Sequence, residues 1–168
     1  MISKATINDV SELNILINSA YRGDSSRKGW TTEANILDGI RTSENELIEI
    51  IQKPNHNIFK FVNDNKIEAC VLLIEKSDKL YLGMLTVNPE LQNSGIGKKI
   101  LLFANELAQK LELKSIEMTV ISVRHELIAW YQRHGFIDNG NREPFPMDDP
   151  EFGLPKQHLE FIVMEKLL

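Results

Sequence analysis

The chain has 168 residues, of which 42% are apolar and 26% are charged, and its formal net charge is −5. This length and composition predict one globular domain over residues 1–168 with a sizeable buried core. The acidic balance gives no general attraction for nucleic acid or anionic membranes, and it suits a cationic small substrate better. No run approaches the roughly 18 apolar residues of a membrane span, and the start lacks a signal-peptide core, so we expect a cytoplasmic protein without a membrane partner.

The first third of the chain has helical patterns. Apolar residues at helical spacing follow Asn8, a good capping residue, and predict a first helix. The apolar spacing within residues 32–40 suggests a second, short helix. Ser43 and Glu46 then form a capping-box pattern ahead of another helix, which Pro54 stops.

The centre of the chain changes to the period of strands. Residues 58–62, 67–74 and 80–87 fit three antiparallel strands separated by short polar turns. The helical period returns over residues 97–111, and residues 116–120 read as a further strand. A strand, helix and strand in this order indicate a parallel crossover unit.

The end of the chain adds a helix and two strands. Residues 126–134 predict a helix that Gly135 ends, and a strand begins at Phe136. Residues 144–155 contain too many prolines for regular structure. Residues 159–167 alternate as a last strand.

The cysteine and histidines give little support for metal or thiol chemistry. Cys70 is the only cysteine and lies in an apolar run, where we expect it to pack in the core. His56, His125, His134 and His158 are scattered, and no pair shows zinc-ligand spacing. We therefore expect no metal site.

The most informative segment is the glycine-rich stretch at residues 88–99, between a predicted strand and a strongly periodic helix. Backbone N–H groups at a helix N-terminus bind anions, and glycine lets a pyrophosphate approach the backbone. A nucleotide P-loop would need glycine where Gln92 stands and a hydroxyl residue where Lys99 stands. A dinucleotide fingerprint would need glycine at Ile100, so both patterns fail.

A third phosphate motif fits. Gln92-Asn93-Ser94-Gly95-Ile96-Gly97 resembles the Gln/Arg-x-x-Gly-x-Gly/Ala turn of the GNAT acyltransferase superfamily. Residues 129–136, in which Trp130 and Tyr131 lead to a Gly-Phe pair, resemble its second signature. Two motifs about 35 residues apart, with a strand between them, are far more specific than either alone.

The resemblance implies an α/β fold with a mixed central sheet of about six to seven strands, flanked by about four helices. The sheet would splay between the family's fourth strand, at residues 80–87, and its fifth, at 116–120. It also implies acetyl-CoA as cosubstrate, with pantetheine beside Leu85 and Val87 and the pyrophosphate at the turn. The cofactor-binding residues would be Leu85, Thr86, Val87, Gln92, Asn93, Ser94, Gly95, Ile96, Gly97, Lys98 and Arg124.

The same resemblance suggests catalytic roles. Tyr131 corresponds to the tyrosine that protonates the departing thiolate, although a core aromatic is the alternative. Residues 80–87 lack the glutamate that some members use as base, and Glu33 is our candidate instead; its alternative is a helix's first-turn acid. Arg124 stands where many relatives carry an asparagine that bonds pantetheine. It would contact coenzyme A or the acceptor, or lie exposed at a helix start.

We therefore expect an N-acetyltransferase that acts on a primary amine of a small molecule or peptide. By the same resemblance, residues 21–32 and the proline-rich loop would frame the acceptor site, since the family's first inter-helix region borders the acceptor pocket and the loop lies between the last two strands in relatives. Acids at 148, 149 and 151 could attract a cation, or they form a solvated acidic loop. Basic residues at 22, 27 and 28 would suit an acceptor with both amine and carboxylate. The alternatives are an acyl-CoA-binding sensor without efficient catalysis and a transferase of a larger acyl group. For the oligomeric state, the sequence is compatible with a monomer or a homodimer.

Overall fold

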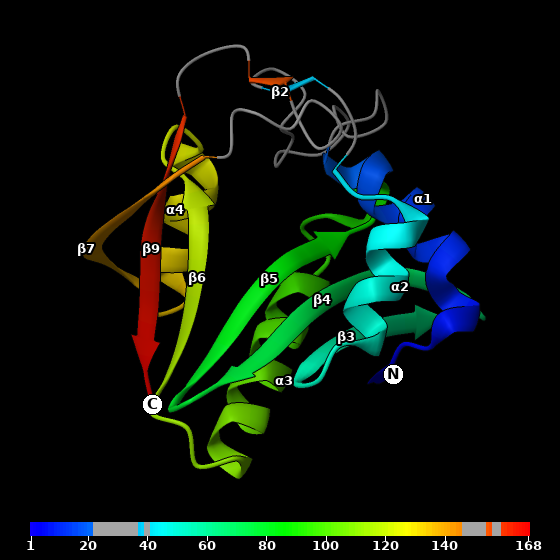
Figure 1. The fold of residues 1–168 in the computed structure, drawn as a ribbon, viewed down its shortest axis with the longest axis horizontal. Helices are drawn as coiled ribbons and strands as arrows, with labels where there is room; N and C mark the ends of the chain where they lie inside the picture. The colour runs from blue at the N-terminus through cyan, green and yellow to red at the C-terminus, as the bar shows by residue number, and fades with distance from the viewer. Residues whose placement is uncertain (22–36, 39–40, 146–153, 156–158) are drawn as a thin grey trace.

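The computed structural model describes residues 1–21, 37–38, 41–145, 154–155 and 159–168, which form a mixed α/β fold (Figure 1). Its main sheet has seven strands in the order β1-β3-β4-β5-β6-β9-β7. The strands are β1 (Ile2–Lys4), β2 (Leu37–Asp38), β3 (His56–Asn63), β4 (Lys66–Lys76), β5 (Lys79–Val87), β6 (Ser115–Ile121), β7 (Ile137–Pro144), β8 (Leu154–Pro155) and β9 (Glu160–Leu167). The helices are α1 (Val10–Tyr21), α2 (Glu44–Gln52), α3 (Ile96–Lys110) and α4 (His125–Arg133), and no described helix is long and apolar enough to cross a membrane.

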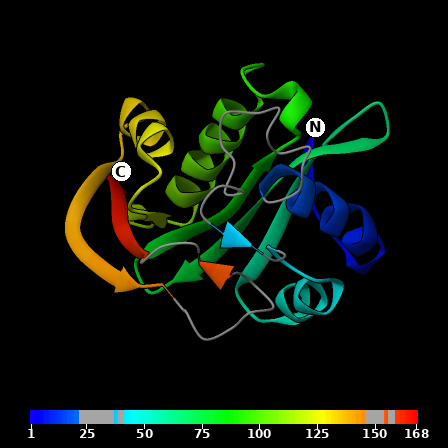
Figure 2. The ribbon, with the colours of Figure 1, turned by 90° about the horizontal axis from the view of Figure 1, so that it is seen from above.

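The helices cover both faces of the sheet, with α3 and α4 on one face and α1 and α2 on the other (Figure 2). The alternation of β4 supplies both cores: Val71 and Leu73 pack on the α3 side, and Cys70 and Leu72 on the α1 side. Cys70 is fully buried, and burial raises the pKa of its thiol to about 12. The thiol is therefore a neutral core group, as predicted.

Most elements agree with the sequence patterns. The strands predicted at 58–62, 67–74 and 80–87 are β3, β4 and β5, and they pair antiparallel. The crossover through α3 is confirmed, because β5 and β6 pair in parallel. The predicted cap of α2 is present, since the Ser43 side chain accepts a hydrogen bond from the Glu46 N–H at 3.2 Å.

Two local expectations were wrong where the structure describes them. The short helix expected over residues 32–40 is extended at Leu37 and Asp38, which form β2 and pair with β8. The proline-rich segment contains regular structure at both ends, because Pro144 closes β7 and Pro155 lies in β8. Both strands lie at sheet edges, where a missing N–H is tolerated. The rest of these two segments lies outside the described residues.

The sheet splays between β5 and β6. These strands pair only over Lys79–Tyr81 and Ser115–Glu117 and then separate (Figure 1). Beyond the ladder, the hydroxyls of Tyr81 and Thr119 still meet at 3.0 Å. Among the described strands, none pairs with the C-terminal half of β5 on its β6 side.

Candidate active site

The turn between β5 and α3 ends in an uncapped helix N-terminus. The Asn88 side chain accepts a hydrogen bond from the Glu90 N–H at 3.0 Å and starts the turn. Gly95 occupies the N-cap position of α3, and no side chain in the described part of the chain caps it. The first N–H groups of α3 are therefore oriented to receive an anion, which the helix dipole also favours.

The two glycines of the turn have different structural reasons. Gly95 has φ of +88°, and a Cβ there would meet no atom within 4 Å, so its backbone conformation rather than crowding favours glycine. A Cβ on Gly97 would lie 3.2 Å from the Trp130 ring. Gly97 thus lets α4 pack closely against the start of α3, which links the two motifs physically.

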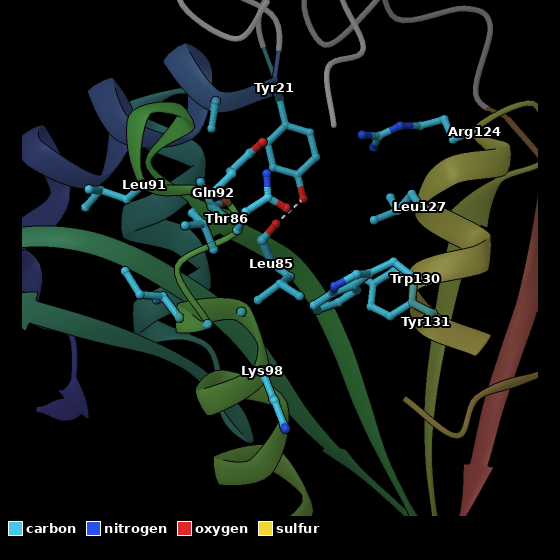
Figure 3. A pocket seen from close by; sticks show the side chains of 16 residues that line it. Tyr21, Leu85, Thr86, Leu91, Gln92, Lys98, Arg124, Leu127, Trp130 and Tyr131 are labelled. Carbon is cyan, nitrogen blue, oxygen red and sulfur yellow. Dashed lines mark hydrogen bonds between the residues drawn. The ribbon is translucent and has the colours of Figure 1, made fainter. Parts of the chain in front are cut away.

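A pocket lies between this turn and α4, and we call it the first pocket. Figure 3 shows Tyr21, Leu85 and Gln92 on one side of it, and Arg124, Leu127 and Trp130 on the α4 side. Its lining residues are Ala20, Tyr21, Leu85, Thr86, Val87, Leu91, Gln92, Asn93, Gly95, Ile96, Gly97, Lys98, Arg124, Leu127, Trp130 and Tyr131.

Nearly all residues that the sequence assigned to the cofactor line this first pocket. Ser94 is the exception, because it is absent from the lining and its hydroxyl donates to the Leu91 carbonyl within the turn. Glu33, the candidate base, lies outside the described residues. The structure therefore brings the two sequence motifs to one site, and it does not identify the general base.

A β-bulge distorts β5 where it borders the pocket. The register between β4 and β5 shifts next to Met84, whose φ of 50° is left-handed. The Thr86 hydroxyl donates to the Met84 carbonyl at 2.9 Å. The Tyr21 hydroxyl donates to the Leu85 carbonyl at 2.6 Å, as Figure 3 shows. Tyr21 thus fixes the strand at the residue that follows the bulge.

Tyr131 lies on α4 with 5% of its surface exposed. Its ring packs edge-on against Trp130, with centroids 5.2 Å apart, and against Phe136 at 5.8 Å. Burial raises the pKa of its hydroxyl far above the ordinary value, and the nearby Tyr21 adds to the effect. Tyr131 is therefore a neutral phenol at physiological pH, and the described residues offer its hydroxyl no hydrogen-bond partner.

Arg124 stands at the N-cap position of α4. It is half-buried, and its guanidinium carbon lies 5.9 Å from the centroid of the Tyr21 ring. This placement differs from the exposed helix-start arginine that was one expectation. The side chain faces the pocket between β5 and α4.

A second pocket adjoins the first one, where β5 and β6 separate, and we call it the second pocket. It shares Tyr21, Leu85, Arg124, Leu127 and Tyr131 with the first pocket, so the two pockets meet at these residues. Its remaining lining residues are Arg41, Glu46, Ile50, Leu72, Tyr81, Leu82, Gly83, Met84, Met118, Thr119, Val120, Ile121, Glu143, Phe145 and Phe161.

Comparison with known families identifies this arrangement. A family model described as an acetyltransferase (GNAT) domain matches residues 54–138. The chain belongs to the GNAT acetyltransferase family. The match spans β3 to the start of β7 and therefore includes both motifs and the bulged strand.

Solved structures share this fold over nearly the whole chain. An N-acetyltransferase from Staphylococcus aureus Mu50 aligns with a TM-score of 0.74 at 15% identity, covering 99% of this chain and 96% of that chain. The ribosomal-protein-S18-alanine N-acetyltransferase from Escherichia coli gives 0.73 at 16% identity, covering 99% and 92%. The PaiA N-acetyltransferase from Thermoplasma acidophilum, in complex with coenzyme A, gives 0.71 at 19% identity, covering 100% and 98%. No curated protein sequence matches the chain.

Sequence reasoning missed several side chains of this GNAT site. Tyr21 was expected only as the first residue of a segment framing the acceptor site, and its hydrogen bond to Leu85, 64 positions away, was not predicted. Arg41 and Leu127 carried no motif, and only their contact with the pockets reveals them. Trp130 belonged to the second motif, but its packing over Gly97 could not be read from spacing. No group of three metal-binding side chains occurs among the described residues.

Proposed function

We propose that this GNAT domain transfers the acetyl group of acetyl-CoA to a primary amine by direct attack in a ternary complex. The observation that carries the proposal is the meeting of two pockets at Leu85 and Tyr131. The first pocket has a helix N-terminus suited to a pyrophosphate, and the second leaves room for an acceptor. Family membership and the coenzyme A complex of the Thermoplasma enzyme support the choice of cosubstrate.

The backbone of the first pocket suits two parts of coenzyme A, the pyrophosphate and the pantetheine arm. We assign the pyrophosphate to the N–H groups from Asn93 to Lys98, where the helix dipole favours negative charge. The pantetheine arm would lie along Leu85–Val87, since no strand in the described part of the chain pairs with β5 there on its β6 side. The carbonyl of Leu85 accepts from Tyr21 and has a second lone pair for a pantetheine amide.

The proposed acetyl transfer takes place where the two pockets meet. The amine nitrogen attacks the thioester carbon, the C–N bond forms, and an N–H near Leu85 stabilises the oxyanion. Collapse of the intermediate breaks the C–S bond and releases a thiolate. Tyr131 keeps its proton at neutral pH, so its hydroxyl can donate a hydrogen bond to the departing sulfur. We assign to it the general acid that protonates this sulfur, with the phenol regaining a proton from solvent after the product leaves.

The amine must also lose a proton. An alkyl ammonium is neutral in only about one molecule in a thousand at pH 7, so a base or a water chain has to accept it. β5 contains no glutamate, and Glu46 and Glu143 are the carboxylates among the described lining of the second pocket. Glu33 stays our prediction for this role.

The test combines binding with turnover. Calorimetry on folded protein should detect uptake of acetyl-CoA, and acetyl-CoA should be consumed when a panel of primary amines is added. Mass spectrometry would identify the acetylated product. Binding without consumption across the panel would favour the sensor, whereas faster turnover of a longer acyl-CoA would favour a different acyl donor. Absence of any coenzyme A binding would overturn the proposal.

A further inference from the structure

Arg41 lines the second pocket beside Tyr21, one of the residues at which the two pockets meet, and has no role in the mechanism above. Its backbone is held by Asn18, whose side-chain oxygen accepts from the N–H groups of Arg41 at 2.7 Å and Thr42 at 3.2 Å. The Asn18 amide also donates to the Thr42 carbonyl at 3.0 Å. These three bonds fix the segment ahead of α2, so Arg41 enters the second pocket from an anchored position.

The Arg41 guanidinium lies against Tyr21, with its carbon 5.2 Å from the ring centroid. No carboxylate in the described residues forms an ion pair with Arg41. Arg124 approaches the same ring to 5.9 Å, so two guanidinium groups face one aromatic ring beside the reaction centre. A guanidinium in such a pocket suits a bidentate, charge-assisted contact with a carboxylate.

The carboxylates of the second pocket do not remove this positive region. The Glu46 carboxylate accepts a hydrogen bond from the Thr42 hydroxyl at 2.8 Å. Glu143 lies on β7, the edge strand of the main sheet beyond β6 and β9, and is exposed. Arg41 therefore lines the second pocket without a carboxylate partner among the described residues, next to Tyr21 at the meeting of the two pockets.

We propose that the acceptor is a free α-amino acid with an apolar side chain, whose carboxylate binds Arg41 with support from Arg124. This inference rests on the proposed acetyl transfer. Tyr21 determines how far the Arg41 guanidinium lies from the proposed thioester position. Its ring contacts Arg41, and its hydroxyl donates a hydrogen bond to Leu85, beside that position. The acceptor's carboxylate and attacking amine must therefore be only a few atoms apart. A polyamine has no carboxylate, and a peptide N-terminus has none next to its amine.

The walls of the second pocket fit an apolar side chain. Met118 and Val120 are buried on β6 and line the pocket. Phe145 and Phe161 close it with ring centroids 5.3 Å apart. Burying an aliphatic side chain against these groups removes apolar surface from water, which favours binding.

The test compares three acceptors that share one side chain: leucine, leucinamide and isopentylamine. With acetyl-CoA, we expect kcat/KM for leucine to exceed that for the other two by roughly 10-fold to 100-fold, the range for a charge-assisted contact. Arg41→Gln should raise KM for leucine by roughly 10-fold or more and leave isopentylamine unchanged. Arg41→Lys should recover part of the loss, because it keeps the charge without the planar fork.

Controls separate this inference from the proposed function. Lys110→Gln removes an exposed cation at the end of α3, far from both pockets, and should change neither acceptor. Calorimetry with coenzyme A-saturated protein should show leucine binding that weakens in Arg41→Gln, even if no acetyl transfer occurs. Equal use of leucine and isopentylamine, or equal loss for both in Arg41→Gln, would overturn the amino-acid assignment while leaving acetyl transfer intact. Failure of leucine to bind would overturn it too.

Discussion

At the scale of single residues, Tyr131 combines burial with a hydroxyl that the described fold does not use. We predict that Tyr131→Phe lowers kcat by roughly 100-fold, because the departing sulfur loses its proton donor. Acetyl-CoA binding should change little, since the ring contacts with Trp130 and Phe136 remain. Steady-state kinetics and calorimetry on the same preparation measure both quantities.

The stability of the Tyr131→Phe variant provides the control. Removing a buried hydroxyl without a hydrogen-bond partner in the described structure leaves no orphaned group, so the melting temperature should stay constant or rise. A catalytic loss with unchanged melting temperature would then reflect chemistry rather than misfolding. Full turnover in the variant would remove Tyr131 from the mechanism.

The spacing of residues in the sequence could predict only those parts of the site that consist of residues close together in the chain. The Gln92–Gly97 turn and Tyr131 were recognisable because each belongs to a short motif beside a predicted helix. Tyr21 was not, because its bond to Leu85 depends on how α1 crosses β5. The sequence also supplied only part of the reason for Gly97. It suggested that glycine leaves room for a phosphate, whereas the structure shows that the Trp130 ring packs where a Cβ would stand.

At the scale of elements, the join between β5 and α3 depends on Gly95. Gly95→Ala should lower the free energy of unfolding by roughly 1–2 kcal/mol, because an L-residue at φ of +88° is strained. It should also weaken acetyl-CoA binding, since a Cβ would stand where we place the pyrophosphate. Urea denaturation and calorimetry measure these two effects separately.

Gly95→Asn is the matched comparison. Asparagine tolerates left-handed backbone better than alanine, so stability should recover in part. Its larger side chain would still obstruct the helix N-terminus, and the affinity for acetyl-CoA should remain low. Recovery of affinity together with stability would show that glycine serves only the backbone conformation here.

Helices and strands were predictable where their own apolar residues recur at helical or strand spacing. β4 and α3 have long apolar patterns, and both lie at the predicted positions. Leu37 has no such pattern in its favour: it is extended because it pairs with Pro155, a partner from the other end of the chain. β1 was missed because three residues are too few to show alternation, and its pairing with β3 decides its structure.

At the scale of the whole molecule, the sheet consists of two halves joined by the short ladder between β5 and β6. Charged side chains reinforce that ladder. The Lys79 ammonium lies 2.9 Å from a Glu117 oxygen and 3.3 Å from a Glu165 oxygen. The Ser115 hydroxyl donates to Glu165 at 2.7 Å. This cluster ties β5, β6 and β9 together at the closed end of the splay, and the pockets lie at the open end.

The cluster predicts a dependence of stability on pH. The hydrogen bond from Ser115 lowers the pKa of Glu165 below its ordinary value of 4.5, and Lys79 acts in the same direction. A depressed folded-state pKa gives stability that is fully present above pH 4.5 and is lost as the pH falls through the folded value. Glu165→Gln should therefore lower the free energy of unfolding by about 1 kcal/mol near pH 7.

Urea denaturation of both proteins at a series of pH values measures this effect. The difference between wild type and Glu165→Gln should shrink as the pH falls below 4.5, because wild-type Glu165 then becomes protonated. Glu106→Gln, which removes an exposed carboxylate from α3, should show little difference across the series. A Glu165→Gln difference that stays constant down to complete acid unfolding would mean that packing at β9, rather than the carboxylate's charge, joins the two halves.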